Sequence, residues 1–231
     1  MLGWIIGLSV AAVVSIIAVD ILNNDEIFDE DIGGLSGIDR PSPYERIEAL
    51  SCDTEVEFTD IDRNKADIAV HEIQELLGKD PVECLNSMDA KTRLETAKEL
   101  HKRLCSGFSL DIGLEMGESD IGCAGYYCQG RKVLWVDYRY LLSDKLEYIA
   151  DYLDTVIHEF RHAMQHWFVE DGAYNGVDSD YRERMAVSLH PSVYVGFYEN
   201  PELYYNQLCE RDARAYAAMV MQQLKGAESN V

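Results

Sequence analysis

Positively charged residues are scarce in this sequence, which has 20 Lys and Arg against 42 Asp and Glu and a formal net charge of −22. Such an excess of carboxylates repels the phosphates of nucleic acids and the head groups of anionic lipids. We therefore expect no nucleic-acid partner. The hydrophobic share of 47% is ordinary for a globular chain, so the sequence can bury a sizeable core.

Paired metal-binding cysteines are also missing. The six cysteines have irregular spacings and no C-x-x-C pair, which argues against zinc ribbons and thioredoxin-like sites. An even number permits three disulfides, and Cys123 and Cys128 are the closest pair in the sequence. Small buried thiols in a reducing compartment would give the same pattern, so both alternatives stay open.

The start of the chain lacks charge, because no ionisable side chain occurs from Leu2 to Val19. This run, LGWIIGLSVAAVVSIIAV, has nearly the length that an α-helix needs to cross the hydrocarbon core of a bilayer. No Lys or Arg precedes the run and no clear small-x-small cleavage site follows it, which favours an uncleaved anchor over a removable signal peptide. We therefore predict a single-pass membrane helix in residues 1–22, through which the chain contacts the membrane.

The residues after the anchor are acidic and poor in structure-forming patterns. Neither flank of the anchor has a Lys or Arg before Arg40, and the short uncharged N-terminus suits a cytoplasmic tip, so we expect an extracytoplasmic domain. Acidic side chains, glycines and prolines in residues 23–43 predict a flexible tether. The folded domain is then expected over residues 44–225, with a disordered tail at 226–231.

Hydrophobic periodicity separates helical from extended segments in this domain. It predicts amphipathic helices over Asn64–Leu77 and Ser87–Leu104. From Phe108 to Leu142, short Gly-bounded runs rich in Val, Tyr and Trp favour strands. Gln129-Gly130 is placed as a hairpin turn between two such runs, and Val133–Tyr138 as the strand that enters the next helix. The expected fold class is α+β, with a small mixed sheet and flanking helices.

The next helix, expected over Asp144–Phe168 after a Ser143 cap, contains the sequence H-E-F-R-H. His158 and His162 are four residues apart, so they project from one helix face at the separation that two imidazoles need to bind one Zn²⁺. Glu159 lies about 100° further round the helix. This position suits a catalytic base that takes a proton from water, not a metal ligand.

A catalytic zinc ion usually has three protein ligands, so a third is expected. His166 follows His162 by four residues, but the zinc helices with a third downstream His use H-x-x-G-x-x-H, and no Gly occurs here. We interpret His166 as a structural neighbour of the site. Glu210, in a second amphipathic segment, is the better candidate for the third ligand.

The two segments together resemble the small gluzincin metallopeptidases. The resemblance is carried by T-V-I-H-E-F-R-H-A-M-Q-H and by the later Q-x-x-E-x-D-A-x-x-Y-A, and it covers about Gly125 to Met221, less than half of the chain. It implies a zincin-like domain that hydrolyses peptide bonds in a peptide or protein substrate. It also implies that Glu210 completes a zinc site with His158 and His162, and that Ala213 lets the second helix approach the first.

Three other interpretations also fit the sequence. The H-E-x-x-H motif is short, so the two histidines could be ordinary polar residues of an amphipathic helix. A catalytically inactive, membrane-tethered binding or scaffold domain would also fit, although ligation alone does not need Glu159. A zinc hydrolase of non-peptide amides or esters is a third alternative.

Residues around the motif are harder to assign. Asp154 and Asp212 could orient a zinc-bound imidazole, but we expect each to be a solvated charge. No motif selects an oxyanion donor among Tyr204, Tyr205 and Tyr216. The Tyr-rich region from Gly172 to Pro201 is expected to cover part of the site.

Overall fold

The computed structural model of the chain describes residues 56, 58–120, 123–171 and 179–226. The predicted anchor, the tether and the first residues of the predicted domain lie outside the described residues. The predicted tail also lies outside them, except for Gly226, which is the last residue of a helix. None of the helices in the described ranges is long and apolar enough to span a bilayer.

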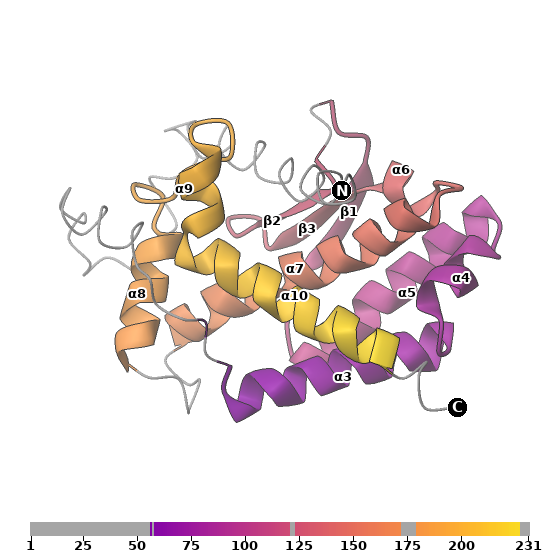
Figure 1. Ribbon diagram of the computed structural model, residues 1–231, viewed down its shortest axis with the longest axis horizontal. Helices are drawn as coiled ribbons and strands as arrows, with labels where there is room; N and C mark the ends of the chain where they lie inside the picture. Colours follow the sequence, from indigo (N-terminus) through magenta and orange to yellow (C-terminus); the bar gives the residue numbers. More distant parts are fainter. Residues whose placement is uncertain (1–55, 57, 121–122, 172–178, 227–231) are drawn as a thin grey trace, which may run out of the picture.

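The described part of the chain is a mixed α+β fold, as predicted. A small sheet of three strands is flanked by helices, and the longest helix, α7, runs through the middle (Figure 1). The elements are, in chain order, α3 (Asp60–Leu77), α4 (Pro81–Asn86), α5 (Ala90–Phe108), β1 (Gly113–Gly117), β2 (Gly125–Cys128), β3 (Val133–Asp137), α6 (Tyr138–Leu141), α7 (Leu146–Asp171), α8 (Ser179–Leu189), α9 (Pro201–Asn206) and α10 (Leu208–Gly226).

Helix α3 begins at Asp60, four residues before the predicted start at Asn64. The prediction missed this first turn because its residues are polar. Thr59 and Asp62 form a capping box, in which the Thr59 hydroxyl accepts the backbone N–H of Asp62 and the Asp62 carboxylate accepts that of Thr59. Hydrophobic periodicity does not detect such a turn, whereas the pattern T-x-x-D does. The cap fixes the position of Asp62, which is buried.

The sheet has the strand order β1-β3-β2, with β1 parallel and β2 antiparallel to β3. The predicted hairpin is confirmed, since β2 and β3 are joined across Gln129–Lys132 and Lys132 has the positive φ of 50° that such turns use. Strand β2 is therefore at an edge of the sheet, and it packs on α7.

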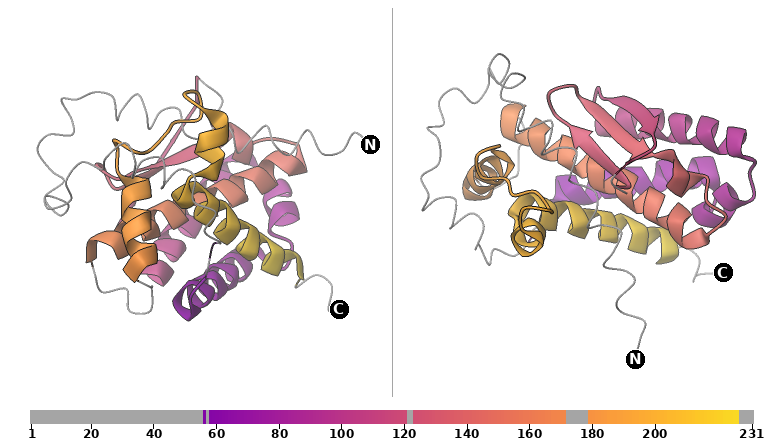
Figure 2. Two further views of the ribbon diagram at one scale, coloured as in Figure 1. Left: turned by 60° about the vertical axis from the view of Figure 1, so that its left-hand side comes forward. Right: turned by 90° about the horizontal axis from the view of Figure 1, so that it is seen from above.

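The core is formed where α7 meets the sheet and the helices α3, α5 and α10. The views in Figures 1 and 2 place the sheet and α10 on different sides of α7. Buried apolar residues from all these elements form the main cluster, which includes Phe108, Leu134, Phe160 and Val220. A second, smaller cluster joins the end of α7 to α8 and the start of α10.

Gly125 allows β2 to approach α7 closely. A Cβ atom at this position would lie 2.8 Å from the Thr155 methyl group and 2.8 Å from the Trp135 carbonyl oxygen, distances that real Cβ atoms do not adopt. Thr155 lies one helical turn before Glu159. The glycine therefore determines how near the edge strand comes to the motif helix.

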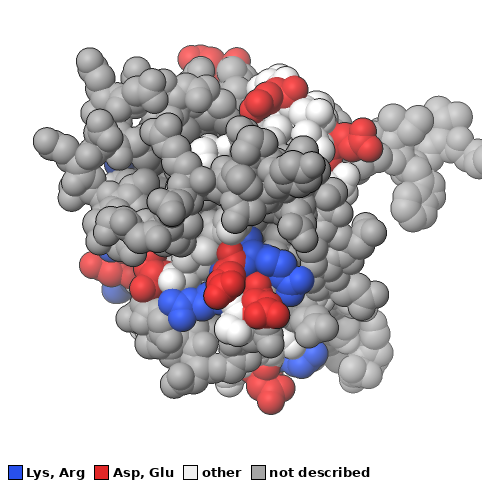
Figure 3. Space-filling model, turned by 90° about the vertical axis from the view of Figure 1, so that its left-hand side faces the viewer, with Lys and Arg blue, Asp and Glu red and all other residues white. Residues whose placement is uncertain are grey.

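Charges of both signs are mixed on the end of the molecule that carries α8. Figure 3 shows this face, where the described Lys and Arg side chains lie beside Asp and Glu side chains. The net negative charge of the chain thus does not gather into one patch among the described residues of this face.

Candidate metal centre

The motif helix α7 spans Leu146–Asp171, two residues later at its start and three later at its end than predicted. Ser143 accepts the backbone N–H of Lys145 just before the helix, close to its predicted role as a cap. The apolar positions Ile149, Leu153 and Ile157 are buried in the core. Because this face of α7 packs in the core, the adjacent face of the helix, which carries His158 and His162, lies toward α10.

The structure brings His158, His162 and Glu210 together. The two imidazole Nε2 atoms are 3.0 Å apart, Glu210 Oε2 is 3.4 Å from His158 Nε2, and Glu210 Oε1 is 3.5 Å from His162 Nε2. Tetrahedral ligands at about 2.0–2.1 Å from one ion are separated by roughly 3.3–3.4 Å. The three side chains thus have nearly the mutual spacing of ligands that share a metal ion.

Glu159 lies beside these atoms but has different partners. His158, Glu159 and His162 offer atoms within 4.8 Å of one another, a group that could hold a metal ion. Glu159 Oε2 accepts the backbone N–H of Tyr127 in β2 at 2.8 Å, while Oε1 is buried without a hydrogen-bond partner. Burial raises the pKa of this carboxyl, against the opposing effects of His158 and His162.

An unpaired buried carboxylate oxygen is costly unless something supplies its missing partner. Glu159 is only 2% exposed, so bulk water does not supply it. His158 and His162 place imidazole nitrogens near this carboxyl, and the three residues form a group that could hold a metal ion.

Glu210 is anchored by two tyrosines, neither of which the sequence selects for this role. The Tyr194 hydroxyl donates to Oε1 at 2.9 Å and the Tyr204 hydroxyl donates to Oε2 at 2.8 Å. Burial opposes ionisation of Glu210, but the charge of His162 and hydrogen bonds from both histidines lower its pKa well below the usual value. The carboxylate is thus held ionised and aimed at the imidazoles.

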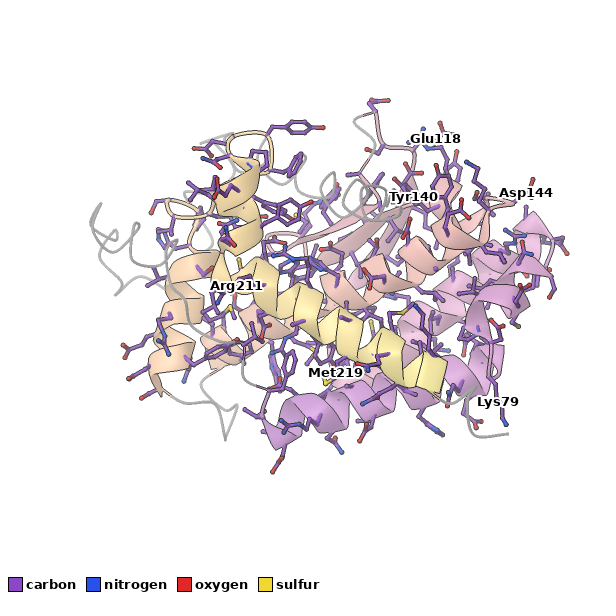
Figure 4. The ribbon with its side chains drawn as sticks, in the orientation of Figure 1. Lys79, Glu118, Tyr140, Asp144, Arg211 and Met219 are labelled. Atoms are coloured by element: carbon purple, nitrogen blue, oxygen red, sulfur yellow. The ribbon has the colours of Figure 1, made fainter. Side chains whose placement is uncertain are left out.

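Tyr194 belongs to the region from Gly172 to Pro201 that was expected to cover the site. Residues 172–178 lie outside the described residues, and the rest of the region forms α8 and the turns before α9. Its contact with Glu210 places the described part of this region at the site. Figure 4 labels Arg211, which follows Glu210 in the first turn of α10.

His162 has a side-chain partner on its other nitrogen, because its Nδ1 is 2.8 Å from Gln165 Oε1. Burial lowers the pKa of His162, but Glu210 and Glu159 outweigh this effect and raise it to about 9. At neutral pH the His162 imidazole is therefore held in its protonated form beside the Glu210 carboxylate. Gln165 is another residue that sequence reasoning missed, although its i+3 spacing from His162 places both on one helix face.

Asp212 corrects a sequence-based expectation. It was expected to be a solvated charge, but it is fully buried and bonded to Arg161, Gln165 and Tyr181. Asp154, in contrast, is only partly buried, and burial raises its pKa against the effect of His158. A carboxylate with buried donors on both oxygens is stable in the core, and that is why the expectation for Asp212 was wrong.

His166 lies next to the site without joining the candidate metal group. Its ring contacts that of Tyr127, with 5.9 Å between the centroids. Burial, with a further effect of His162, lowers its pKa to about 3, so its imidazole is neutral.

The cysteines in the described ranges are free thiols, namely Cys84, Cys105, Cys123, Cys128 and Cys209. Cys123 and Cys128, the closest pair in the sequence, are therefore not bridged. Burial raises the pKa of Cys123 and of Cys209, so neither is poised as a thiolate ligand.

Comparison with protein-family models, with curated proteins and with solved structures finds no match for this chain. The function of the chain is therefore inferred from the motif and from the geometry and surroundings of the candidate metal centre.

Proposed function

We propose that the chain is a zinc-dependent metallopeptidase, with a zincin-like domain that an N-terminal helix tethers to a membrane. Two imidazole nitrogens and one carboxylate form the donor set of a catalytic zinc site that leaves a position for water or substrate. The observation that carries the proposal is the buried, unpaired Glu159 Oε1 beside His158, His162 and Glu210. Glu159 would be needless in a site that only binds metal.

Zinc held by His158, His162 and Glu210 would supply Lewis acidity, which polarises a carbonyl group and makes a water molecule more acidic. Glu159 takes a proton of that water at Oε1 as the water oxygen bonds to the carbonyl carbon, and later delivers it to the amine nitrogen, which leaves with the electron pair of the broken peptide C–N bond. The Tyr127 N–H holds Oε2, so that Oε1 keeps its direction through both transfers. Peptides or proteins are the proposed substrates.

A second candidate function is a domain in which the metal only stabilises the fold. It is favoured by the burial of the site, since Glu159 is 2% exposed and the His158 side chain is 10% exposed. A structural metal site usually has four protein ligands, whereas three converge here in the expected geometry. Peptide hydrolysis by the purified protein distinguishes the two candidates.

Metal removal is the first test of the proposed function. The full-length chain in detergent is expected to contain about one zinc ion per molecule by elemental analysis, because three protein ligands converge on one point. It should cleave members of a fluorogenic peptide library, lose this activity after treatment with a chelator, and regain it with zinc. A chain that binds no zinc when supplied with it, or that cleaves equally well after chelation, contradicts the proposal.

Zinc binding is expected to release a proton. Since the pKa of His162 is raised to about 9, this imidazole is protonated at pH 7, and zinc must displace the proton. The apparent zinc affinity should therefore rise about tenfold per pH unit between pH 7 and 9 and level off above. Calorimetry in buffers of different ionisation enthalpy measures the protons released, and equal heats in all buffers at pH 7.5 would refute this expectation.

A further inference from the structure

The side-chain amide of Gln165 can be oriented from its neighbours alone. Its Nε2 lies 2.8 Å from the Cys209 carbonyl oxygen and 2.7 Å from Asp212 Oδ2. Both neighbours are acceptors, so the amide nitrogen must face them and Oε1 must face His162. Since Oε1 only accepts, the hydrogen between Gln165 and His162 belongs to His162 Nδ1, 2.8 Å away.

A hydrogen on Nδ1 leaves Nε2 as the nitrogen that can give its lone pair to a metal ion. Nε2 is the atom that faces His158 and Glu210. Metal-binding histidines commonly have their other nitrogen fixed in this way, because the partner sets both the tautomer and the ring orientation. Gln165 thus orients the His162 ring so that Nε2, and not Nδ1, faces His158 and Glu210.

Asp212 is in turn immobilised by a buried cation. Arg161 Nε donates to Asp212 Oδ2 at 2.6 Å and Arg161 Nη2 donates to Oδ1 at 3.0 Å, while the Tyr181 hydroxyl also donates to Oδ1 at 2.8 Å. The guanidinium group bonds Asp62 of α3 on its other side. Such a bidentate, fully enclosed pair fixes the carboxylate much more firmly than a solvated contact does.

We propose that Gln165 is the positioning residue for His162, and that Asp212, clamped by Arg161, holds Gln165 in the orientation that presents the His162 Nε2 atom to the metal. The inference rests on the proposed function only for the identity of the metal ion. The first turn of α10 therefore contributes to the site in two ways. Glu210 lies beside His158 and His162, while the Cys209 carbonyl and Asp212 hold Gln165.

The test compares Gln165→Met with Gln222→Met in the full-length chain. Gln165→Met keeps the side-chain volume but removes the acceptor of His162, whereas Gln222→Met makes the same change at an exposed position of α10. Competition with a chromophoric chelator should show zinc binding about 10–100-fold weaker in Gln165→Met. Gln222→Met should bind zinc as the parent does. Equal affinities in Gln165→Met and the parent, or equal losses in both variants, overturn the proposal.

A second measurement, NMR of the His162 ring, uses only the parent chain and does not depend on activity. In the metal-free parent labelled with ¹⁵N-histidine, NMR should detect a slowly exchanging His162 Nδ1–H, because this hydrogen is bonded in either protonation state of the ring. A fast-exchanging or absent signal in the folded parent overturns the proposal. If the signal and the zinc affinities behave as expected but no peptide is cleaved, the proposed peptidase activity fails while the role of Gln165 stands.

Discussion

Replacing Glu159 by Gln is expected to lower peptide hydrolysis by about 10²–10⁴-fold, the usual contribution of a general base, while zinc stays bound. The Gln side chain keeps an oxygen for the Tyr127 N–H, so β2 and α7 should remain in contact. It has no lone pair basic enough to take a proton from water. Hydrolysis rates and zinc content, measured on the same samples, check both halves of this expectation.

Glu147→Gln is the matched control, since Glu147 is an exposed residue near the start of the same helix. It removes one negative charge from α7 and should change neither rate nor zinc content. If Glu159→Gln cleaves peptides at the parental rate, Glu159 is not the base and the proposed mechanism is wrong. If the parent and both variants bind zinc but none cleaves any peptide, a stabilising metal becomes the better explanation.

The longer helices and the hairpin could be predicted because their signals are local, whereas the shorter helices α4, α6, α8 and α9 were not predicted. Apolar periodicity located most of α5 and α7, and Gln129-Gly130 located the turn between β2 and β3. The face shared by His158 and His162 follows from helical geometry alone. Glu210 could be selected only by resemblance, since 48 positions separate it from His162 and no local rule brings α10 onto α7.

The surroundings of the candidate metal centre could not be predicted, because their contacts join distant parts of the chain. Tyr194 reaches Glu210 from the turns after α8, and Asp212 meets Arg161 across 51 positions. From the sequence alone an Asp is expected to be exposed unless a partner is known. The partner of Asp212 is Arg161, the arginine inside H-E-F-R-H. A buried cation in a metal-binding motif should therefore prompt a search for acidic partners in the other helices.

Replacing Arg161 by Met is expected to lower the free energy of unfolding of the metal-free protein by about 3–5 kcal/mol, the usual cost of removing one partner from a buried ion pair. The change leaves the carboxylates of Asp62 and Asp212 buried without their cation. It also removes the guanidinium group from the Tyr216 ring, whose centroid is 4.9 Å away. Chemical denaturation of parent and variant at pH 7 measures the difference.

The loss of unfolding free energy in Arg161→Met should depend on pH in a defined direction. Burial raises the pKa of Asp62, but Arg161 and hydrogen bonds from Thr59 outweigh this and lower it below its usual 3.8. The ionised carboxylate therefore stabilises the parent above that pH, and the contribution disappears as the pH falls through the lowered pKa. The difference between parent and Arg161→Met should accordingly shrink in acid.

Arg63→Met provides the control, because Arg63 pairs with Asp60 on the surface of α3, where both side chains are largely exposed. Solvated pairs of this kind contribute little, so its unfolding curve should overlay that of the parent. Equal stability of Arg161→Met and Arg63→Met would mean that the buried charges are not paired as described. A large loss confined to Arg161→Met would instead tie the stability of the fold to the residues that hold Gln165 against His162.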